Sequence, residues 1–209
     1  MTRPLLFDID GTLVDTLGAG RAALERAMIE VYDETGPIDE LDFHGRTDPS
    51  IVRELLGAAG RTGPWISARF PTLWRTYLAC LEEELSRREG EVTLFEGVLD
   101  LLDALDGDDR FTIGLVTGNL EGGAKRKLRA GGIAERFTFG AYGSDSERRA
   151  DLPPIAVDRA SALIGTRLRT KDAIVIGDTP ADISCARASG ARVLAVATGR
   201  HGPAELRHF

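Results

Sequence analysis

The sequence predicts an α/β fold in which a parallel β-sheet is covered on both faces by helices and interrupted by one helical insertion. Short apolar runs that suit buried strands alternate with helical stretches at the start of the chain and again from residue 93 onward. Such alternation implies right-handed crossovers and a parallel sheet. Residues 16–92 show helical periodicity and no convincing strand. Polar motifs follow three of the predicted strands, where parallel α/β sheets bind their ligands.

The first predicted strand ends in two aspartates. Residues 5–13 form an apolar run that reaches Asp8 and Asp10 and continues into Gly11 and a threonine. Because strand side chains alternate between faces, both aspartates lie on one side while the extended geometry lasts, and Gly11 lets the second turn away. Two carboxylates at the end of a buried strand are costly unless a cation or phosphate chemistry uses them. A strand followed by an Asp-rich turn explains the bare pattern equally well.

Three helices are expected in the insertion. Asp15–Thr16 offers an N-cap for a helix from about residue 17 to residue 32. Asp48, with a proline directly after it, looks like the N-cap of a second helix. A third helix runs from about residue 65 to residue 88, and Pro71 either splits it or marks its start.

The second half of the chain alternates between strands and helices. Strands are predicted at residues 111–116, 173–176 and 192–196, with a further short one at 137–139. Helices are predicted at residues 97–105, in the Lys- and Arg-rich stretch before residue 131, and at residues 153–164 and 180–190.

Composition and charge narrow the range of partners. The chain has 209 residues, 43% hydrophobic and 28% charged, which is typical of a globular protein. A formal net charge of −7 argues against a nucleic-acid partner, because such proteins neutralise phosphates with basic residues. A small anionic partner is compatible with it, because a metal ion or a helix N-terminus can reverse the field within a site.

The cysteines and the apolar runs indicate a cytoplasmic protein with no membrane partner. Cys80 and Cys185 show no metal-ligand spacing and cannot form a disulfide framework, which suits a reducing compartment. The apolar run at the N-terminus is interrupted at Asp8, so it does not look like a signal peptide. No uninterrupted apolar segment approaches the roughly 18 residues that span a bilayer. We expect a monomer or a weak homodimer.

Four carboxylates are expected to converge at the carboxyl edge of the sheet: Asp8, Asp10, Asp178 and Asp182. Two carboxylates about 4 Å apart repel by roughly 4 kcal/mol at an effective dielectric near 20, so several together need a divalent cation. An all-oxygen set suits Mg²⁺, and no cysteine or histidine of these motifs supports zinc. Taken alone, Asp178 is also explained as a helix N-cap and Asp182 as an ordinary first-turn acid.

The strand at 111–116 ends in Thr117, Gly118 and Asn119, which offer a hydroxyl and loop N–H groups to an anionic oxygen, although an ordinary turn explains the triplet as well. Together with the acidic motifs, this arrangement resembles the phosphatase branch of the haloacid dehalogenase superfamily. Residues 8–13 match its D-x-D-G-T-[LV] signature in full, Thr117 matches its strand-terminal threonine, and residues 177–182 match its G-D-x-x-x-D signature.

The resemblance covers nearly the whole chain, because the insertion follows the first strand, where that family places its cap. It implies a Rossmann-like core of residues 1–15 and 93–209 with an inserted helical cap domain of residues 16–92. It also implies a Mg²⁺-dependent phosphomonoesterase of a small phosphorylated metabolite, which works through an aspartyl-phosphate.

Roles for the motif residues follow from the resemblance. Asp8 would attack phosphorus, and Asp10 would protonate the leaving oxygen and later activate water, a role favoured by a raised pKa beside other acids. Thr117 and the N–H groups of Gly118 and Asn119 would hold the phosphoryl oxygens. The Mg²⁺ ligands would come from Asp8, the backbone carbonyl of Asp10, and Asp178, with Asp182 close behind either as a residue that supports the ligands or as an alternate ligand.

One part departs from the family pattern. The usual cation is a lysine in a K-P-x-P context, but residues 146–154 contain no lysine. The lysines of this half of the chain come too early or too late: Lys125, Lys127 and Lys171. Arg149 is the first candidate for this role and Arg148 the second. An arginine can bridge Asp8 and a phosphate bidentately without reproducing the point charge of a lysine.

Residues 45–48, Gly-Arg-Thr-Asp, resemble a cap-loop motif of phosphoglycolate-phosphatase-like members, which implies that Arg46 meets the substrate. A solvated or helix-capping arginine is an equally simple interpretation. Two alternatives to the phosphomonoesterase stay open. One is a sugar phosphomutase similar to β-phosphoglucomutase, which retains both aspartates, and the other is a catalytically weak phosphate-binding homologue, suggested by the missing lysine.

Overall fold

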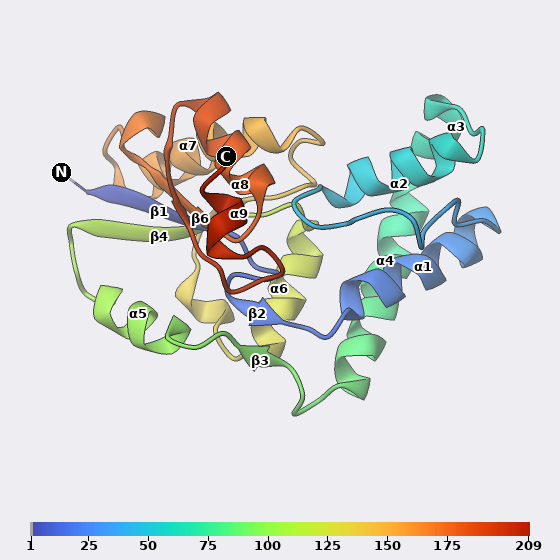
Figure 1. The fold of residues 1–209 in the computed structure, drawn as a ribbon, viewed down its shortest axis with the longest axis horizontal. Coiled ribbons are helices and arrows are strands. Elements are labelled where there is room, and N and C mark those ends of the chain that lie inside the picture. Colours follow the sequence, from blue (N-terminus) through green and yellow to red (C-terminus); the bar gives the residue numbers. More distant parts are fainter. Residues whose placement is uncertain (1) are drawn as a thin grey trace.

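A five-stranded parallel sheet forms the centre of the computed structural model, which describes residues 2–209 (Figure 1). The strand order is β5-β4-β1-β6-β7, and every neighbouring pair is parallel. The strands are β1 (Arg3–Phe7), β4 (Phe111–Val116), β5 (Gly140–Ala141), β6 (Ile174–Gly177) and β7 (Arg192–Ala195). This confirms the predicted α/β fold with a parallel sheet.

Alternation along β1 explains why helices cover both faces of the sheet. Leu5 and Phe7 pack with residues of α5 and α6, whereas Leu6 packs with residues of α7 and α8. The two helical layers lie on opposite sides of the sheet in Figure 1. Their bounds are α5 (Val98–Leu105), α6 (Glu121–Ala130), α7 (Leu152–Ile164) and α8 (Pro180–Ser189). Because β1 is buried from Pro4 onward, every position from Pro4 to Phe7 is apolar, and the charged Arg3 at its start is exposed.

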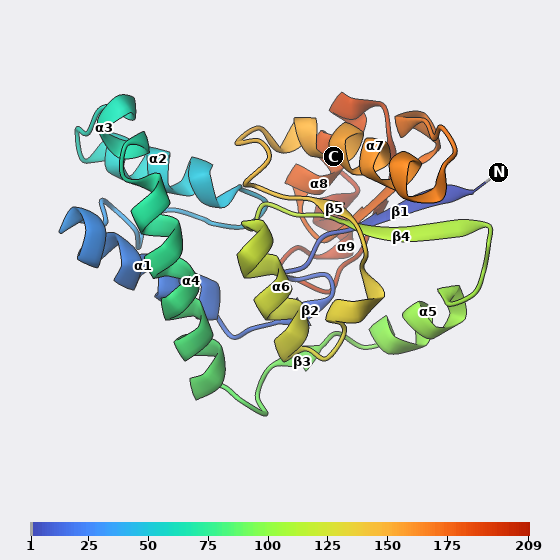
Figure 2. The same cartoon turned by 180° about the vertical axis from the view of Figure 1, so that it is seen from behind.

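The helical insertion lies beside the α/β part and has a hydrophobic core of its own (Figures 1 and 2). It begins and ends at a short antiparallel pair, β2 (Val14–Asp15) and β3 (Thr93–Leu94). Between them run α1 (Ala19–Tyr32), α2 (Asp48–Ala58), α3 (Gly63–Ser67) and α4 (Phe70–Arg87). The predicted insertion is confirmed, and its description as a separate domain of residues 16–92 stays a prediction.

Short helical turns complete the chain: η1 (Ala134–Arg136), η2 (Arg149–Asp151), η3 (Thr170–Asp172) and α9 (Pro203–Leu206). Among residues 2–209, no helix is both long enough and apolar enough to cross a membrane.

Several predicted boundaries are wrong, for local reasons. Helix α1 is preceded by Gly18 in the left-handed region at φ 75°, and Asp15 accepts a hydrogen bond from the N–H of Leu17 (2.8 Å) instead of capping the helix. Helix α2 has Thr47 as its N-cap, so Asp48 is its first residue. The predicted strand at 137–139 is displaced to β5. The third helix of the insertion is split into α3 and α4 just before Pro71, which is one of the two outcomes expected at this proline.

Candidate active site

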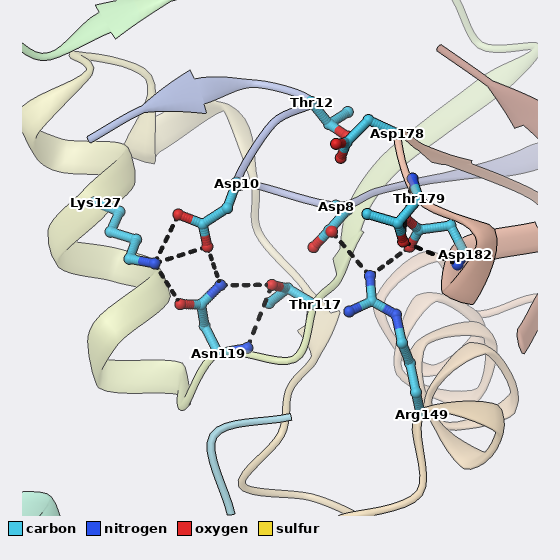
Figure 3. Close-up of polar contacts among 10 residues, drawn as sticks. All are labelled: Asp8, Asp10, Thr12, Thr117, Asn119, Lys127, Arg149, Asp178, Thr179 and Asp182. Carbon is cyan, nitrogen blue, oxygen red and sulfur yellow. Dashed lines mark hydrogen bonds and ion pairs between the residues drawn. The ribbon is translucent and has the colours of Figure 1, made fainter. Parts of the chain in front are cut away.

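The loops after β1, β4 and β6 meet the insertion around a cavity of about 750 Å³. The residues of the core that line it include the predicted site residues after β1 and β4, which are Asp8, Asp10, Thr117, Gly118 and Asn119, and also Arg149 from η2. Asp178 and Asp182, which follow β6, are not among the lining residues. The insertion contributes His44, Arg46 and Tyr77. The sequence-predicted residues are therefore brought together at one edge of the sheet, as Figure 3 shows for the side chains of the core.

Asp8 is buried at the floor of this cavity, with 5% of its surface exposed. Its carboxylate forms an ion pair with Arg149, whose Nη2 lies 2.8 Å from Oδ2. Burial raises the pKa of Asp8 to about 7, because the pairing with Arg149 only partly offsets the loss of water and the nearby Asp182 and Asp10 add repulsion. A further cation near Asp8 would therefore stabilise its ionised form.

Arg149 is the arginine that faces Asp8. Its buried guanidinium bridges Asp8 and Asp182, and its Nε has no hydrogen-bond partner among the described residues. The side chain of Arg148 is 80% exposed and lies 3.9 Å from Asp151. Of these two candidates for the cationic residue, Arg149 lies at the carboxylate of Asp8 and Arg148 lies in solvent.

Asp10 has a partner that sequence reasoning missed. Lys127 of α6 places Nζ 2.7 Å from each carboxylate oxygen of Asp10 and 2.7 Å from Oδ1 of Asn119 (Figure 3). Desolvation alone would raise the pKa of Asp10, but the charge and hydrogen bond of Lys127 and the amide of Asn119 hold this pKa below its usual value. The expectation of a raised pKa is therefore wrong. A signal was present, because Lys127 lies at helical spacing on the same face of α6 as the buried Ala124 and Leu128.

Asp178 is fully buried, and one of its oxygens is unused. Oδ1 accepts a hydrogen bond from Thr12 (3.0 Å), while Oδ2 has no partner among residues 2–209. The pKa of Asp178 is raised by this burial. The N-cap of α8 is Thr179, so the helix-cap interpretation of Asp178 is wrong.

Asp182 has both oxygens engaged. Oδ1 accepts from Arg149, and Oδ2 accepts from the N–H (3.1 Å) and the hydroxyl (2.7 Å) of Thr179. This is a capping box in which Asp182 closes the first turn of α8 and also supports Arg149.

The residues present fit a divalent cation. Oxygens of Asp8, Asp178 and Asp182 all lie within 4.8 Å of one another. A Cβ on Gly199 would come within 1.9 Å of the unused oxygen of Asp178, and one on Gly11 within 2.4 Å. Two glycines therefore leave room beside a buried carboxylate oxygen that has no partner among residues 2–209, and such an oxygen suits a hard cation.

Thr117 and Asn119 form a connected pair beside Asp8. The fully buried hydroxyl of Thr117 accepts from the side-chain amide of Asn119 at 2.8 Å. Gly118 lies under the insertion, because a Cβ there would lie 1.8 Å from the carbonyl oxygen of Arg46. The contact of these residues with a phosphoryl group stays a prediction.

The loop before α2 attaches the insertion to the core. Asp48 donates its N–H to the carbonyl of Gly118, and its carboxylate accepts from the N–H of Leu120, both at 2.8 Å. Burial raises the pKa of Asp48 to about 6, with the positive charge of Lys127 acting against the shift. Arg46 lines the cavity while its guanidinium pairs with Glu54 of α2.

Known proteins share this arrangement of motifs and fold. A sequence model of the family described as haloacid dehalogenase-like hydrolase matches residues 5–196. The chain belongs to this family. The haloacid dehalogenase-like assignment confirms the resemblance carried by the aspartate motifs and makes the chain a hydrolase by descent.

Relatives within the haloacid dehalogenase-like family are distant and align with this chain over most of their length. A phosphoglycolate phosphatase of Rhodospirillum rubrum is 26% identical over 204 residues, covering 95% of this chain and 81% of the relative. Pyrophosphatase PpaX of Listeria monocytogenes is 24% identical over 205 residues, covering 98% and 88%.

Solved structures support the fold. A hydrolase from Pseudomonas syringae superposes with a TM-score of 0.71 at 20% identity, covering 100% of this chain and 90% of the other. CbbY from Rhodobacter sphaeroides, solved with phosphate, gives 0.63 at 22% identity, covering 97% and 90%.

Proposed function

We propose that the chain is a Mg²⁺-dependent phosphomonoesterase of a small phosphorylated metabolite that works through an aspartyl-phosphate on Asp8. The surroundings of Asp8 carry the proposal. A buried carboxylate faces a cavity of about 750 Å³, pairs with Arg149, and has a partnerless oxygen of Asp178 in its vicinity. A nucleophile, a cation for the phosphoryl oxygens and a metal ligand are thus held by three separate segments.

In the first step, a carboxylate oxygen of Asp8 bonds to phosphorus as the bond from phosphorus to the ester oxygen breaks. The leaving oxygen takes a proton from the protonated form of Asp10, a form that pairing with Lys127 disfavours, and departs as an alcohol. In the second step, water gives a proton to Asp10 and bonds to phosphorus, and the bond between phosphorus and Asp8 breaks. One water is consumed, phosphate is released, and both aspartates return to their starting state.

Arg149 and the Thr117 loop would stabilise the charge that develops on the phosphoryl oxygens. The guanidinium already touches Asp8, so a bound phosphoryl group would meet its remaining N–H groups. Mg²⁺ held by Asp8, Asp178 and the backbone carbonyl of Asp10 would supply positive charge that lowers repulsion between nucleophile and phosphate. Asp182 has both oxygens engaged, so we assign it the support of Arg149 before metal binding.

The insertion would close the site and select the substrate. Its residues line the cavity together with those of the core, and Arg46 lies where the backbone of its loop contacts Gly118. Phosphoglycolate and pyrophosphate are the first substrates to examine, because distant relatives carry phosphatase and pyrophosphatase names.

Phosphate release from a panel of phosphoesters tests the proposal. With Mg²⁺, the purified protein should release inorganic phosphate from p-nitrophenyl phosphate and from at least one small metabolite, and EDTA should remove this activity. Asp8→Asn should abolish turnover. No release from any substrate would refute the proposal, and an isomerised sugar phosphate without free phosphate would identify a phosphomutase instead.

A further inference from the structure

We propose that Lys127 is a positioning residue for the hydrolysis, which orients Asp10 for the step that breaks down the aspartyl-phosphate. This inference rests on the proposed function. Lys127 is only 4% exposed, and a lysine is almost never so buried unless it is paired. Its ammonium group has three N–H donors, and three acceptor oxygens lie 2.7 Å away, two on Asp10 and one on Asn119.

Lys127 also determines which way the amide of Asn119 points. An ammonium group can only donate, so the atom of Asn119 that faces it is the carbonyl oxygen. The NH₂ group of Asn119 is then directed at Oδ2 of Asp10 (2.7 Å) and at the hydroxyl of Thr117 (2.8 Å). One buried cation thereby sets the orientation of both Asp10 and Thr117.

Packing from the insertion keeps Lys127 in place. Gly20 of α1 lies over the ammonium group, where a Cβ would come within 3.0 Å of Nζ and 3.3 Å of Cε. That position would also lie 3.8 Å from the hydroxyl of Tyr77 in α4. Helix α1 therefore covers the lysine without a side chain between them, and Nζ has little space except toward Asp10.

Asp10 is consequently held by three hydrogen bonds from two residues, and its carboxylate is directed away from Asp8 toward α6 (Figure 3). A carboxylate that accepts a proton from water must keep a fixed direction relative to phosphorus. Lys127 lines the cavity, but its ammonium group is engaged by Asp10 and Asn119 and would not bond to phosphorus or to the leaving oxygen. It acts on the reaction through Asp10.

The test separates formation of the phosphoenzyme from its breakdown. With 2,4-dinitrophenyl phosphate, the leaving group needs no proton, so the first step depends on Asp8 and the second on Asp10. Lys127→Met should form the phosphoenzyme at close to the wild-type rate, seen as a burst of dinitrophenolate. Its breakdown, followed by rapid quench, should slow by about 10²-fold, the usual size of a general-base contribution.

A matched control lies on the same helix. Lys125 is 60% exposed and pairs with Glu121, so Lys125→Met should leave both rates unchanged. Adding Lys127→Met to Asp10→Asn should slow breakdown no further, because the lysine acts through that aspartate. Lys127→Gln, which is neutral but keeps an NH₂ group that can donate, should show the same selective loss if the methionine variant fails to fold.

The outcomes distinguish this inference from the proposed function. Wild-type protein that forms no phosphoenzyme and releases no phosphate overturns the proposed function. Wild-type turnover combined with equal losses of both steps in the folded Lys127 variants, or with no loss, overturns the positioning role alone. Additive losses with Asp10→Asn do the same.

Discussion

Replacing Asp48 by asparagine should stabilise the protein above neutral pH and have little effect near pH 4. Asp48 is 8% exposed at the contact between α2 and the core, where its carboxylate accepts from the N–H of Leu120. An asparagine oxygen can accept the same hydrogen bond. The substitution therefore removes the charge at this position and retains the shape of the contact.

The expected magnitude follows from the pKa of Asp48. Burial raises this pKa from 3.8 to about 6, so the folded protein binds the proton more tightly than the unfolded chain does. The free energy of unfolding is highest below pH 4, falls as the pH rises through the interval from 4 to 6, and is constant above it. A shift of about 2 units corresponds to about 3 kcal/mol. Asp48→Asn should avoid this loss.

Urea unfolding at a series of pH values from 4 to 8 measures the effect. The quantity of interest is the unfolding free energy of Asp48→Asn minus that of the wild type, because contributions of unrelated groups cancel in this difference. It should increase by about 3 kcal/mol between pH 4 and pH 7.

A control variant separates burial from general charge effects. Asp39 belongs to the same insertion, and its side chain is 96% exposed. A rise with pH that Asp39→Asn shares would be a general effect of removing a negative charge and not an effect of burial at position 48. A flat difference for Asp48→Asn, or one that falls with rising pH, would show that the carboxylate is ionised at little cost in the folded protein and would refute the reasoning.

Three further predictions concern the catalytic edge of the sheet. Arg149→Met should lower kcat by about 10²-fold, since charge stabilisation at the phosphoryl group is lost, whereas Arg148→Met should retain wild-type activity; equal losses in a phosphatase assay would contradict the assignment. Asp178→Asn should raise the Mg²⁺ concentration needed for half-maximal activity by at least about tenfold, and isothermal titration with Mg²⁺ checks this directly; unchanged metal affinity would exclude Asp178 as a ligand. Gly199→Ala places a Cβ 1.9 Å from the free oxygen of Asp178, so it should also weaken Mg²⁺ binding, and an unaffected Mg²⁺ titration would show that the loop moves aside.

Sequence reasoning recovered the parts of the fold that depend on local patterns. The strand that precedes Asp8 is apolar from Pro4 to Phe7 because both of its faces are covered, and this run is recognisable without any structure. The convergence of Asp8, Thr117 and Asp178 follows from the parallel arrangement alone, because the carboxyl ends of neighbouring strands share one edge.

Other features depend on contacts between distant segments and were missed for that reason. Lys127 is separated by 117 positions from Asp10, so no local spacing relates the two. Gly18 starts α1 because its backbone adopts φ 75°, a conformation that any loop glycine can supply and that the Asp15–Thr16 cap signal concealed. Asp182 looked available for a metal until Arg149 and Thr179 were seen to occupy both its oxygens.

The charges at this edge of the sheet support the proposed binding of a divalent cation. Four carboxylates converge there, and the structure supplies two cations, with Lys127 on Asp10 and Arg149 between Asp8 and Asp182. Two negative charges are left uncompensated, and they are found where Asp178 has a free oxygen and where burial raises the pKa of Asp8 to about 7. One divalent cation balances them. Its binding would favour the ionised form of Asp8, so the same ion that completes the charge balance would also keep the nucleophile ready to react at neutral pH.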